Sequence, residues 1–498
     1  MLVWRAHVTW GEARSAGAER GAHVQPSTFR QLFPTEDDWH DPADQRPPGG
    51  NVPKLVGAGR APARTRVEAG GAAAVPRCGN AGQYDDVPSP ARRNVHIVVD
   101  FALSDEQLLV QHSARAFAEA EILPHIREWD EKGEVHREVF DRMGEQGFLG
   151  APIPEAYGGA GMDYISYALL CEELERADTA FRVVQSVHVG LNSLALLQWG
   201  TEEQRRRWLV PQARGEKLAT FGLTEPGTGT DAANLATTAR RDGEAYRLNG
   251  QKIWISLADV ADHFLVFASV DRSMRHKGVT AFMVERGMPG LSTGTLHGKL
   301  GIRAGNTGII NLDDVPVPVE NRIGEEGEGF LVAMSAIDQG RYTVAAGAVG
   351  LAQACLDASV RYAHERQTFG EEIGHHQLVK QLIANMVRGI DAGRLLVWRA
   401  GALKNRGLRN TRETSLAKWH ATEHAVQCAL DAIQVHGANG YSNEFPVERY
   451  LRNSKAAVIY EGTSQLHTLI QADYALGYRE DRPLRCEPWP AQGFEKPV

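Results

Sequence analysis

The sequence predicts an α+β multidomain fold, in which an N-terminal helical domain precedes a central antiparallel β-barrel and a C-terminal four-helix bundle. Two changes in hydrophobic period support this order. Apolar residues recur at helical spacing to about residue 217, alternate with a period of two to about residue 325, and then return to helical spacing in long alanine-rich segments. We therefore expect domains at 99–217, 218–325 and 326–480, followed by a tail at 481–498.

Composition narrows the class of protein. The chain has 498 residues, 43% of them hydrophobic, and a net charge of −8 with acidic and basic residues intermixed, so large cores are expected and a nucleic-acid surface is not. Its five cysteines are scattered, without a CxxC pair, which argues against a disulfide framework and fits a reducing cytoplasm. No apolar run approaches the length of a membrane span, and the first residues lack the apolar core of a secretory signal. We expect a cytoplasmic protein with no membrane span.

Residues 1–98 differ from the rest of the chain. They are rich in Ala, Gly, Pro and Arg and show neither helical nor strand periodicity. They are predicted to be a disordered extension, or to precede the true start of the protein. The acidic run TEDDWHDPAD at residues 35–44 fits a transit peptide poorly.

Local signals place the elements within each domain. Capping boxes at Ser104–Gln107 and Thr201–Gln204 predict helix starts in the N-terminal domain. In the middle domain we expect hairpin turns at Asp242-Gly243 and Asn249-Gly250, between the short strands ATFGL, TTARR, AYRLNG, QKIWIS, HFLVFASV and TAFMVE. Four long helices with short connections then predict an antiparallel bundle.

A carboxylate at a turn is the first candidate for chemistry. In AVIYEGTSQL, residues 456–465, Glu461 precedes a glycine and is flanked by hydroxyl side chains, so the backbone can bend towards a ligand. Glu461 is thus a candidate base. The alternative is an exposed glutamate at a helix start, since Thr463 and Ser464 are good N-cap residues.

Three other motifs carry weaker signals. The loop GLTEPGTGTD, residues 222–231, could hold the polar edge of a cofactor or be a threonine-rich turn. The strand KIWIS, residues 252–256, could set an aromatic wall against a flat ring or carry a core tryptophan. HATEH, residues 420–424, matches a zinc pattern through His420 and His424, but no third ligand is obvious, and we expect no metal.

Five motifs in order resemble the acyl-CoA dehydrogenases: GLTEPGTGTD, QKIWIS, GRYTVAAGAVGLAQACLDASVRYAHERQTFG, QVHGANGYSNEFPVERYLRNSK and IYEGTSQ. The resemblance covers about the C-terminal 400 residues. It implies an FAD enzyme that oxidises the Cα–Cβ bond of an acyl-CoA thioester to a trans-2-enoyl-CoA. By motif position Glu461 would be the base that removes the α proton, and the β hydrogen would leave as hydride to flavin N5.

The resemblance also assigns binding residues. Two departures from the family pattern, Thr230 where serine is common and the sequence WISL where WITN is usual, keep a hydroxyl near the flavin. The FAD-binding residues implied are Phe221, Leu223, Thr224, Thr230, Trp254, Ser256, Thr463 and Gln465 in one subunit, with Arg366, Phe369, Gln377, Gln434 and Gly437 reaching the FAD of a neighbouring subunit. Those implied for the substrate are Arg182, Thr230, Asp338, Arg341, Tyr460 and Gly462. A homo-oligomer, most simply a tetramer, follows from the shared FAD.

The substrate and the electron acceptor stay open at this point. Arg182 falls where the glutaryl-CoA dehydrogenase branch holds a distal carboxylate, or it is a surface arginine paired with Glu175 or Asp178. In some family members the base lies one residue before Arg341, but here that position is Gly340. An electron-transfer flavoprotein is the expected acceptor. The alternatives are an acyl-CoA oxidase that uses oxygen and a non-catalytic FAD or acyl-CoA binding scaffold.

Overall fold

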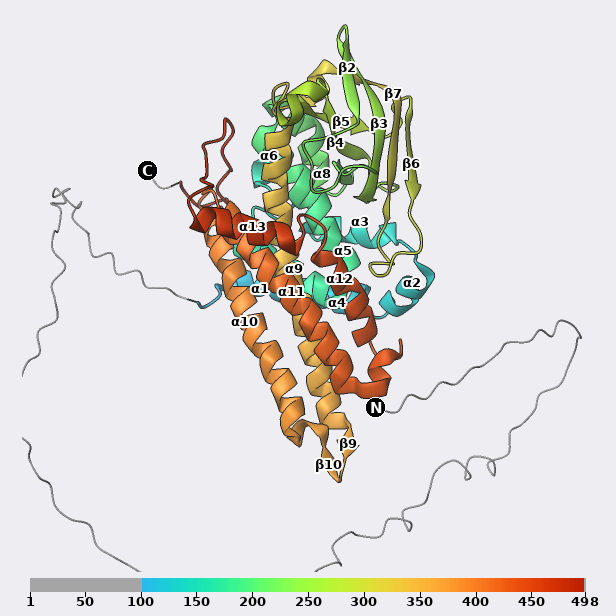
Figure 1. Ribbon diagram of the computed structural model, residues 1–498, viewed down its shortest axis with the longest axis vertical. Coiled ribbons are helices and arrows are strands. Elements are labelled where there is room, and N and C mark those ends of the chain that lie inside the picture. Colours follow the sequence, from blue (N-terminus) through green and yellow to red (C-terminus); the bar gives the residue numbers. More distant parts are fainter. Residues whose placement is uncertain (1–100, 497–498) are drawn as a thin grey trace, which may run out of the picture. The chain divides into compact units, whose positions relative to one another are not determined.

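The computed structural model describes residues 101–496, and the prediction for residues 1–98 lies outside this range. An N-terminal set of helices leads into a sheet, and long C-terminal helices run away from the sheet (Figure 1). Both predicted capping boxes are present, at Ser104 before the first helix and at Thr201 before a later one. The N-terminal α-helices are α1 (Asp105–Glu121), α2 (Ile126–Lys132), α3 (Arg137–Glu145), α4 (Tyr164–Ala177), α5 (Thr179–Val184), α6 (Leu194–Trp199), α7 (Glu202–Gln204) and α8 (Val210–Ala213).

Two stretches of π-helix interrupt this region, which the sequence did not predict. They are η6 (Gln185–Ser193), between α5 and α6, and η7 (Arg205–Leu209), between α7 and α8. The wider turn of a π-helix is rare and is often found at functional sites. All nine residues of η6 are buried, so this segment is part of the protein core.

Two helical stretches, Thr179–Trp199 and Gly329–Glu365, are long and apolar enough to cross a membrane by length and composition. Both stretches contain polar residues, so neither is the unbroken apolar run that the sequence analysis considered. The most apolar window of the first is 100% buried inside the protein, and that of the second is 72% buried. Such burial is typical of core helices in a folded domain, because these helices are apolar on all faces.

The middle region is an eight-stranded sheet with the order β6-β7-β3-β2-β4-β5-β8, in which β1 also pairs with β4. Most pairs are antiparallel as predicted, but β1 and β2 pair with β4 in parallel. Strand β4 is buried along its whole length, which fits its unbroken apolar sequence. The strands are β1 (Ala219–Gly222), β2 (Thr238–Asp242), β3 (Ala245–Ser256), β4 (His263–Ser269), β5 (Val279–Glu285), β6 (Leu291–Thr295), β7 (Thr307–Pro318) and β8 (Arg322–Ile323).

One of the two predicted hairpin turns is correct. Asp242 and Ala245 pair across the turn between β2 and β3. Asn249-Gly250, however, lies inside β3, where the register against β7 shifts, so this turn prediction was wrong. Gly250 has a φ of 151°, and a Cβ there would lie 2.7 Å from Thr237 Cα. The glycine therefore serves a β-bulge and a close backbone approach instead of a turn.

The C-terminal region is a helical bundle, as predicted. Three long helices pack side by side, α9 (Gly329–Glu365), α10 (Gln377–Asn405) and α11 (Thr411–His436), and two shorter ones follow, α12 (Val447–Ala457) and α13 (Ser464–Ala475) (Figure 1). The small strands β9 (Gln367–Thr368) and β10 (Glu371–Glu372) join α9 to α10. Glycine lets α9 approach α4 closely, because a Cβ at Gly350 would overlap the Glu172 carbonyl oxygen.

We predict that Gly250→Ala destabilises the protein. The added methyl must push against Thr237, and overpacking of this kind costs about 1–3 kcal/mol. The thermal unfolding midpoint of the variant should fall below that of the parent protein. Gly227→Ala is the matched control, because a Cβ at Gly227 meets no atom within 4 Å. Equal unfolding midpoints for the two variants would contradict the prediction.

Candidate active site

The predicted base stands on a turn between α12 and α13 that has unusual backbone geometry. Glu461 has a φ of 55° and Gly462 a φ of 101°, so two successive residues are left-handed. A glutamate rarely adopts this conformation, and such outliers gather at functional sites. Thr463 then caps α13 by accepting a hydrogen bond from the Leu466 amide, so the helix-start reading was correct for threonine and not for Glu461.

Two cationic side chains from other helices hold the turn. Arg341 of α9 donates from Nε to the Glu461 carbonyl oxygen at 2.9 Å. Lys418 of α11 donates from Nζ to the Gly462 carbonyl oxygen at 2.6 Å. Both left-handed residues therefore have their carbonyl groups bound by positive charges, and such charge-assisted hydrogen bonds are stronger than neutral ones.

Two cavities meet at Glu461, and both are lined by it. The larger has a volume of about 1350 Å³ and the smaller about 590 Å³. Tyr460, Trp254 and Leu223 also line both. A side chain at this junction can touch one molecule in each cavity. Glu461 is therefore placed to act between two bound groups.

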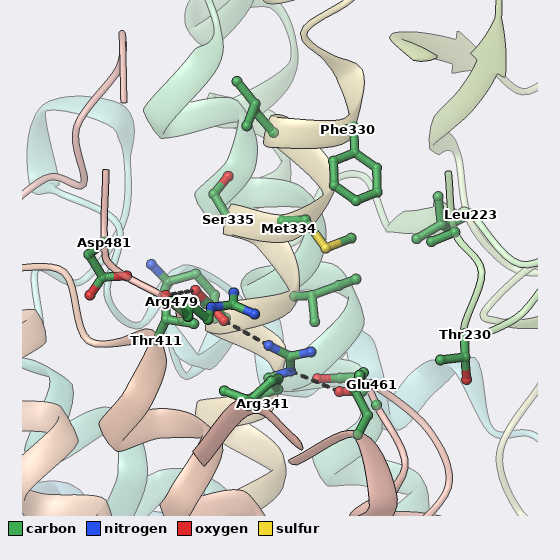
Figure 2. A pocket seen from close by; sticks show the side chains of 18 of the residues that line it. Leu223, Thr230, Phe330, Met334, Ser335, Arg341, Thr411, Glu461, Arg479 and Asp481 are labelled. Carbon is green, nitrogen blue, oxygen red and sulfur yellow. Dashed lines mark hydrogen bonds and ion pairs between the residues drawn. The ribbon is translucent and has the colours of Figure 1, made fainter. Parts of the chain in front are cut away.

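Figure 2 shows the walls of the larger cavity. Leu223 and Thr230 lie on one side, and residues of the chain end lie opposite, including Arg479 and Asp481. Helix α9 supplies a third wall at helical spacing, through Phe330, Met334, Ile337, Asp338 and Arg341. The predicted substrate residues Asp338, Arg341, Tyr460 and Gly462 all line this cavity, together with Thr230 and Thr463.

The carboxyl group of Glu461 is desolvated. Its Oε2 atom is buried and has no hydrogen-bond partner within residues 101–496. Burial raises the pKa of Glu461 to about 7, and the positive charges of Arg182, Lys418 and Arg341 oppose that rise. Gly340 makes room for the carboxyl group, since a Cβ there would overlap Oε2. A side chain at position 340, one residue before Arg341, would therefore occupy the same space as the Glu461 carboxyl group.

The smaller cavity suits a flat ring. Trp254 lies at a β-bulge of β3 with a φ of 62°, and 62% of its surface is exposed, so it is not the core tryptophan of the alternative reading. Phe221 and the hydroxyls of Thr224 and Ser256 line the same cavity. An aromatic face with a few polar groups fits a heteroaromatic cofactor.

A buried ion pair fixes the loop at residues 222–231. Lys252 of β3 bonds Glu225 at 2.7 Å and the Leu223 carbonyl oxygen at 3.2 Å. Glu225 in turn accepts hydrogen bonds from the Ala236 and Thr237 amides. These contacts hold Leu223 and Thr224 at the junction of the two cavities. Sequence inspection missed Glu225 because its neighbours, glycine and threonine, carried the motif.

Arg182 is paired with Glu175, one of the two acidic partners considered in the sequence, and it also lines the smaller cavity. It is fully buried and bonds Glu175, so it is not a surface arginine. It also donates to Ser186 Oγ at 2.6 Å and to the Tyr460 hydroxyl at 2.5 Å. Because Glu175 already supplies a counter-ion, Arg182 does not require one from a substrate. Arg182, Ser186 and Tyr460 line the smaller cavity, and Glu175 does not.

Six of the predicted FAD-binding residues line neither cavity. Gln465 is exposed on α13. The others lie at the ends of α9, α10 and α11 beside β9 and β10, where Phe369 is 98% exposed. These are Arg366, Phe369, Gln377, Gln434 and Gly437. The sequence assigned them to the FAD of a neighbouring subunit, and their distance along the bundle from Glu461 is compatible with that assignment.

The histidines of HATEH have structural partners. His420 Nε2 lies 3.1 Å from the Gly389 carbonyl oxygen, and His424 Nε2 lies 3.1 Å from that of Met386. Both contacts join α11 to α10. The part of the chain that the structure describes contains no group of three or more His, Cys, Asp or Glu side chains placed to hold a metal.

Sequence inspection also missed the chain end. The C-terminal segment, residues 477–492, is not a free tail, because residues 477–484 and Pro488 line the larger cavity. Arg485 bonds Glu328, the Cys486 carbonyl accepts from Gln198, and Trp489 packs edge-on against Tyr157. The segment thus crosses back to the N-terminal helices. Its proline and charged residues gave no period that could have predicted this path.

Comparison with known proteins agrees with the arrangement of these elements. Three family profiles match in order: "Acyl-CoA dehydrogenase, N-terminal domain" at residues 104–216, "middle domain" at 220–315 and "C-terminal domain" at 327–476. Together they span the helices, the sheet and the bundle. The C-terminal profile ends before the C-terminal segment begins.

Individual proteins match over nearly their whole length. The short-chain specific acyl-CoA dehydrogenase of Clostridium acetobutylicum is 41% identical over 372 residues, covering 75% of this chain and 98% of its own. The structure of butyryl-CoA dehydrogenase from Megasphaera elsdenii is 39% identical with a TM-score of 0.75, covering 76% of this chain and 100% of its own. A glutaryl-CoA dehydrogenase solved with glutaryl-CoA is 38% identical with a TM-score of 0.75, covering 76% and 98%. The chain therefore belongs to the acyl-CoA dehydrogenase family of FAD-dependent oxidoreductases.

Proposed function

We propose that the protein oxidises short-chain acyl-CoA thioesters to trans-2-enoyl-CoA, with Glu461 as the base that removes the α proton. The observation that carries the proposal is the Oε2 atom of Glu461, which is buried and has no hydrogen-bond partner among the described residues, where the two cavities meet. A base must reach the carbon-bound proton directly, and a carboxylate already bound by donors would be weaker.

The environment of Glu461 suits this task. A pKa raised to about 7 makes the carboxylate a better proton acceptor while part of it stays ionised near neutrality. Negative charge develops on the thioester oxygen as the proton leaves, and the backbone amide of Glu461 is the protein donor that we assign to it. The pinned carbonyl groups of Glu461 and Gly462 keep this turn in place during the reaction.

The cofactor would lie in the smaller cavity against Trp254, Phe221, Thr224 and Ser256. Bound FAD supplies the acceptor for the β hydrogen, which leaves with its bonding electrons. The role of these side chains is to hold the ring flat and to exclude water from the space beside Glu461. The nucleotide part of the acyl-CoA would occupy the larger cavity, whose walls carry more polar groups.

The acyl group would extend past Glu461 into the smaller cavity, where its far end would meet Arg182, Ser186 and Tyr460 beside the cofactor. We assign a short chain because Arg182, Ser186 and Tyr460 place polar groups on this wall of the smaller cavity, and an alkyl chain gains little by packing against polar groups. The curated relatives described as short-chain specific support the assignment.

A dicarboxylyl substrate is the second candidate. Arg182, Ser186 and Tyr460 line the cavity with a guanidinium group and two hydroxyl groups, which favours this candidate. The Glu175 carboxylate, which pairs with Arg182, does not line the cavity. A distal carboxylate could accept hydrogen bonds there. The matching glutaryl-CoA dehydrogenase structure supports this reading.

Partners follow from the same proposal. We assign an electron-transfer flavoprotein as acceptor, supported by a 40% identical chain from the structural study of the electron transferring flavoprotein of Acidaminococcus fermentans (TM-score 0.75, covering 76% of this chain and 100% of its own). A homotetramer in the cytoplasm is proposed because the exposed Phe369 and its neighbours would complete a cofactor site in another subunit. The alternatives are an oxidase that uses oxygen as the acceptor and a protein without catalytic activity. Activity measurements with each acceptor would distinguish them.

Glu461→Gln should abolish turnover and leave FAD bound. The amide cannot accept the α proton, so anaerobic flavin reduction by butyryl-CoA should slow by roughly 10²–10⁴-fold. The visible spectrum of the purified variant should still show flavin. Glu423→Gln, on the exposed face of α11, is the matched control and should behave as the parent protein. An unimpaired Glu461→Gln variant would refute the assigned role.

The rate of flavin reduction should rise with pH through about 7 and then level off. Glu461 acts in its ionised form, and the raised pKa places that ionisation near neutrality. Stopped-flow reduction between pH 5.5 and 9 measures the midpoint. A flat profile across this range would mean that an ordinary carboxylate, or another group, limits the reaction.

Butyryl-CoA should bleach the flavin anaerobically at least as completely as glutaryl-CoA. Glu175 neutralises Arg182, so the closed end of the cavity needs no second negative charge. Parallel titrations of the purified protein compare the two thioesters. Bleaching by glutaryl-CoA alone would select the dicarboxylyl substrate instead.

A further inference from the structure

Lys418 is a buried lysine beside the proposed base that the family resemblance did not assign. It lies on α11, its side chain has an exposed fraction of 0%, and it lines neither cavity. Its ammonium group donates to the Gly462 carbonyl oxygen at 2.6 Å. Burying an ammonium group is unfavourable without a compensating partner, so the position calls for a physical reason.

The backbone of the turn gives the first reason. Glu461 and Gly462 are both left-handed, and the Glu461 conformation is unfavourable for a residue with a side chain. Arg341 holds the first carbonyl group from α9, and Lys418 holds the second from α11. If either donor is lost, the turn keeps one anchor and can relax towards a commoner backbone conformation.

Charge gives the second reason. Three cations act on Glu461: Arg182 of α5, Arg341 of α9 and Lys418 of α11. Arg182 is paired with Glu175, and Arg341 lies 3.0 Å from Asp338. Lys418 forms no ion pair with a carboxylate in residues 101–496. Among the charged groups around Lys418, Glu461 does most to favour its protonated form.

The remaining groups around the pair do not replace this charge. Tyr167 of α4 is buried and Tyr460 is half-buried, and desolvation raises the pKa of both phenols, so they stay neutral. His467 of α13 also stays neutral, since burial lowers its pKa to about 3. Glu423 is exposed one turn along α11 and acts only weakly on Lys418. Burial lowers the pKa of Lys418 to about 7, opposed by the charge of Glu461.

We propose that Lys418 is a positioning residue for Glu461, which holds the turn through the Gly462 carbonyl group and favours the ionised carboxylate through its charge. This inference rests on the proposed role of Glu461. Two variants distinguish the effect of the hydrogen bond from the effect of the charge. Lys418→Met removes both the donor and the charge, whereas Lys418→Gln removes the charge and keeps an N–H donor on a side chain that is one bond shorter.

The test is the pH dependence of anaerobic flavin reduction by butyryl-CoA in the FAD-loaded full-length protein. Lys418→Met should move the midpoint up by at least one pH unit and lower the high-pH plateau by about tenfold or more. Lys418→Gln should show the same shift in midpoint with a plateau close to that of the parent protein. Lys418→Arg, which keeps the charge, should return the midpoint towards its original value.

Flavin content and the thermal unfolding midpoint are measured for every variant, and Lys277→Met, an exposed lysine on η8 (Arg272–Gly278), controls for loss of a positive charge elsewhere. A lowered plateau with an unchanged midpoint in both Lys418→Met and Lys418→Gln would show a structural role only and overturn the proposal. So would a profile like that of the parent protein. Normal flavin reduction by Glu461→Gln would refute the proposed function. Impaired reduction by Glu461→Gln, together with an unchanged midpoint in the Lys418 variants, would refute only the role of Lys418.

Discussion

Desolvation of one carboxyl group organises the centre of this protein. A glutamate placed between two cavities must be kept out of water to be basic enough, yet it must keep enough of its charge to accept a proton. Burial of Glu461 acts in one direction, and three cations from three separate helices act in the other. The N-terminal helices, the bundle helix α9 and the bundle helix α11 each contribute one of these cations. The balance therefore exists only when the N-terminal helices and the bundle are packed together.

The two domains of helices are joined by side chains that also serve the site. Arg182 reaches from α5 to Tyr460, the residue before Glu461, while its other groups bond Glu175 and Ser186. Glycine residues of α9 allow this close packing, because a Cβ at Gly347 would overlap Glu175 and one at Gly340 would overlap Glu461. A buried ion pair of this kind contributes little net stability, so its value lies in fixing geometry.

Sequence patterns predicted the order of the domains because hydrophobic period reports burial directly, and the capping boxes at Ser104 and Thr201 were correct because they depend on local contacts. Asn249-Gly250 was misassigned because Gly250 is required by its close approach to Thr237, which only the folded structure reveals, and in the sequence it looks like a turn glycine. Glu461, Trp254 and Arg341 could be named from motifs. Lys418 could not, since its role depends on a carbonyl group 44 residues away. Glu175, the counter-ion of Arg182, was one of the two acidic residues considered, but that pairing was expected on the surface and is buried.

The C-terminal segment makes the end of the chain part of the cavity wall. It follows the last helix, forms no regular element of its own, and contacts Glu328, Gln198 and Tyr157 through Arg485, Cys486 and Trp489. Its length can therefore change without altering a helix or a strand. A change of length within residues 477–488 would reshape the wall of the larger cavity while Glu461 and its three cations stayed in place. Evolution could in this way vary which thioesters enter without altering how they react.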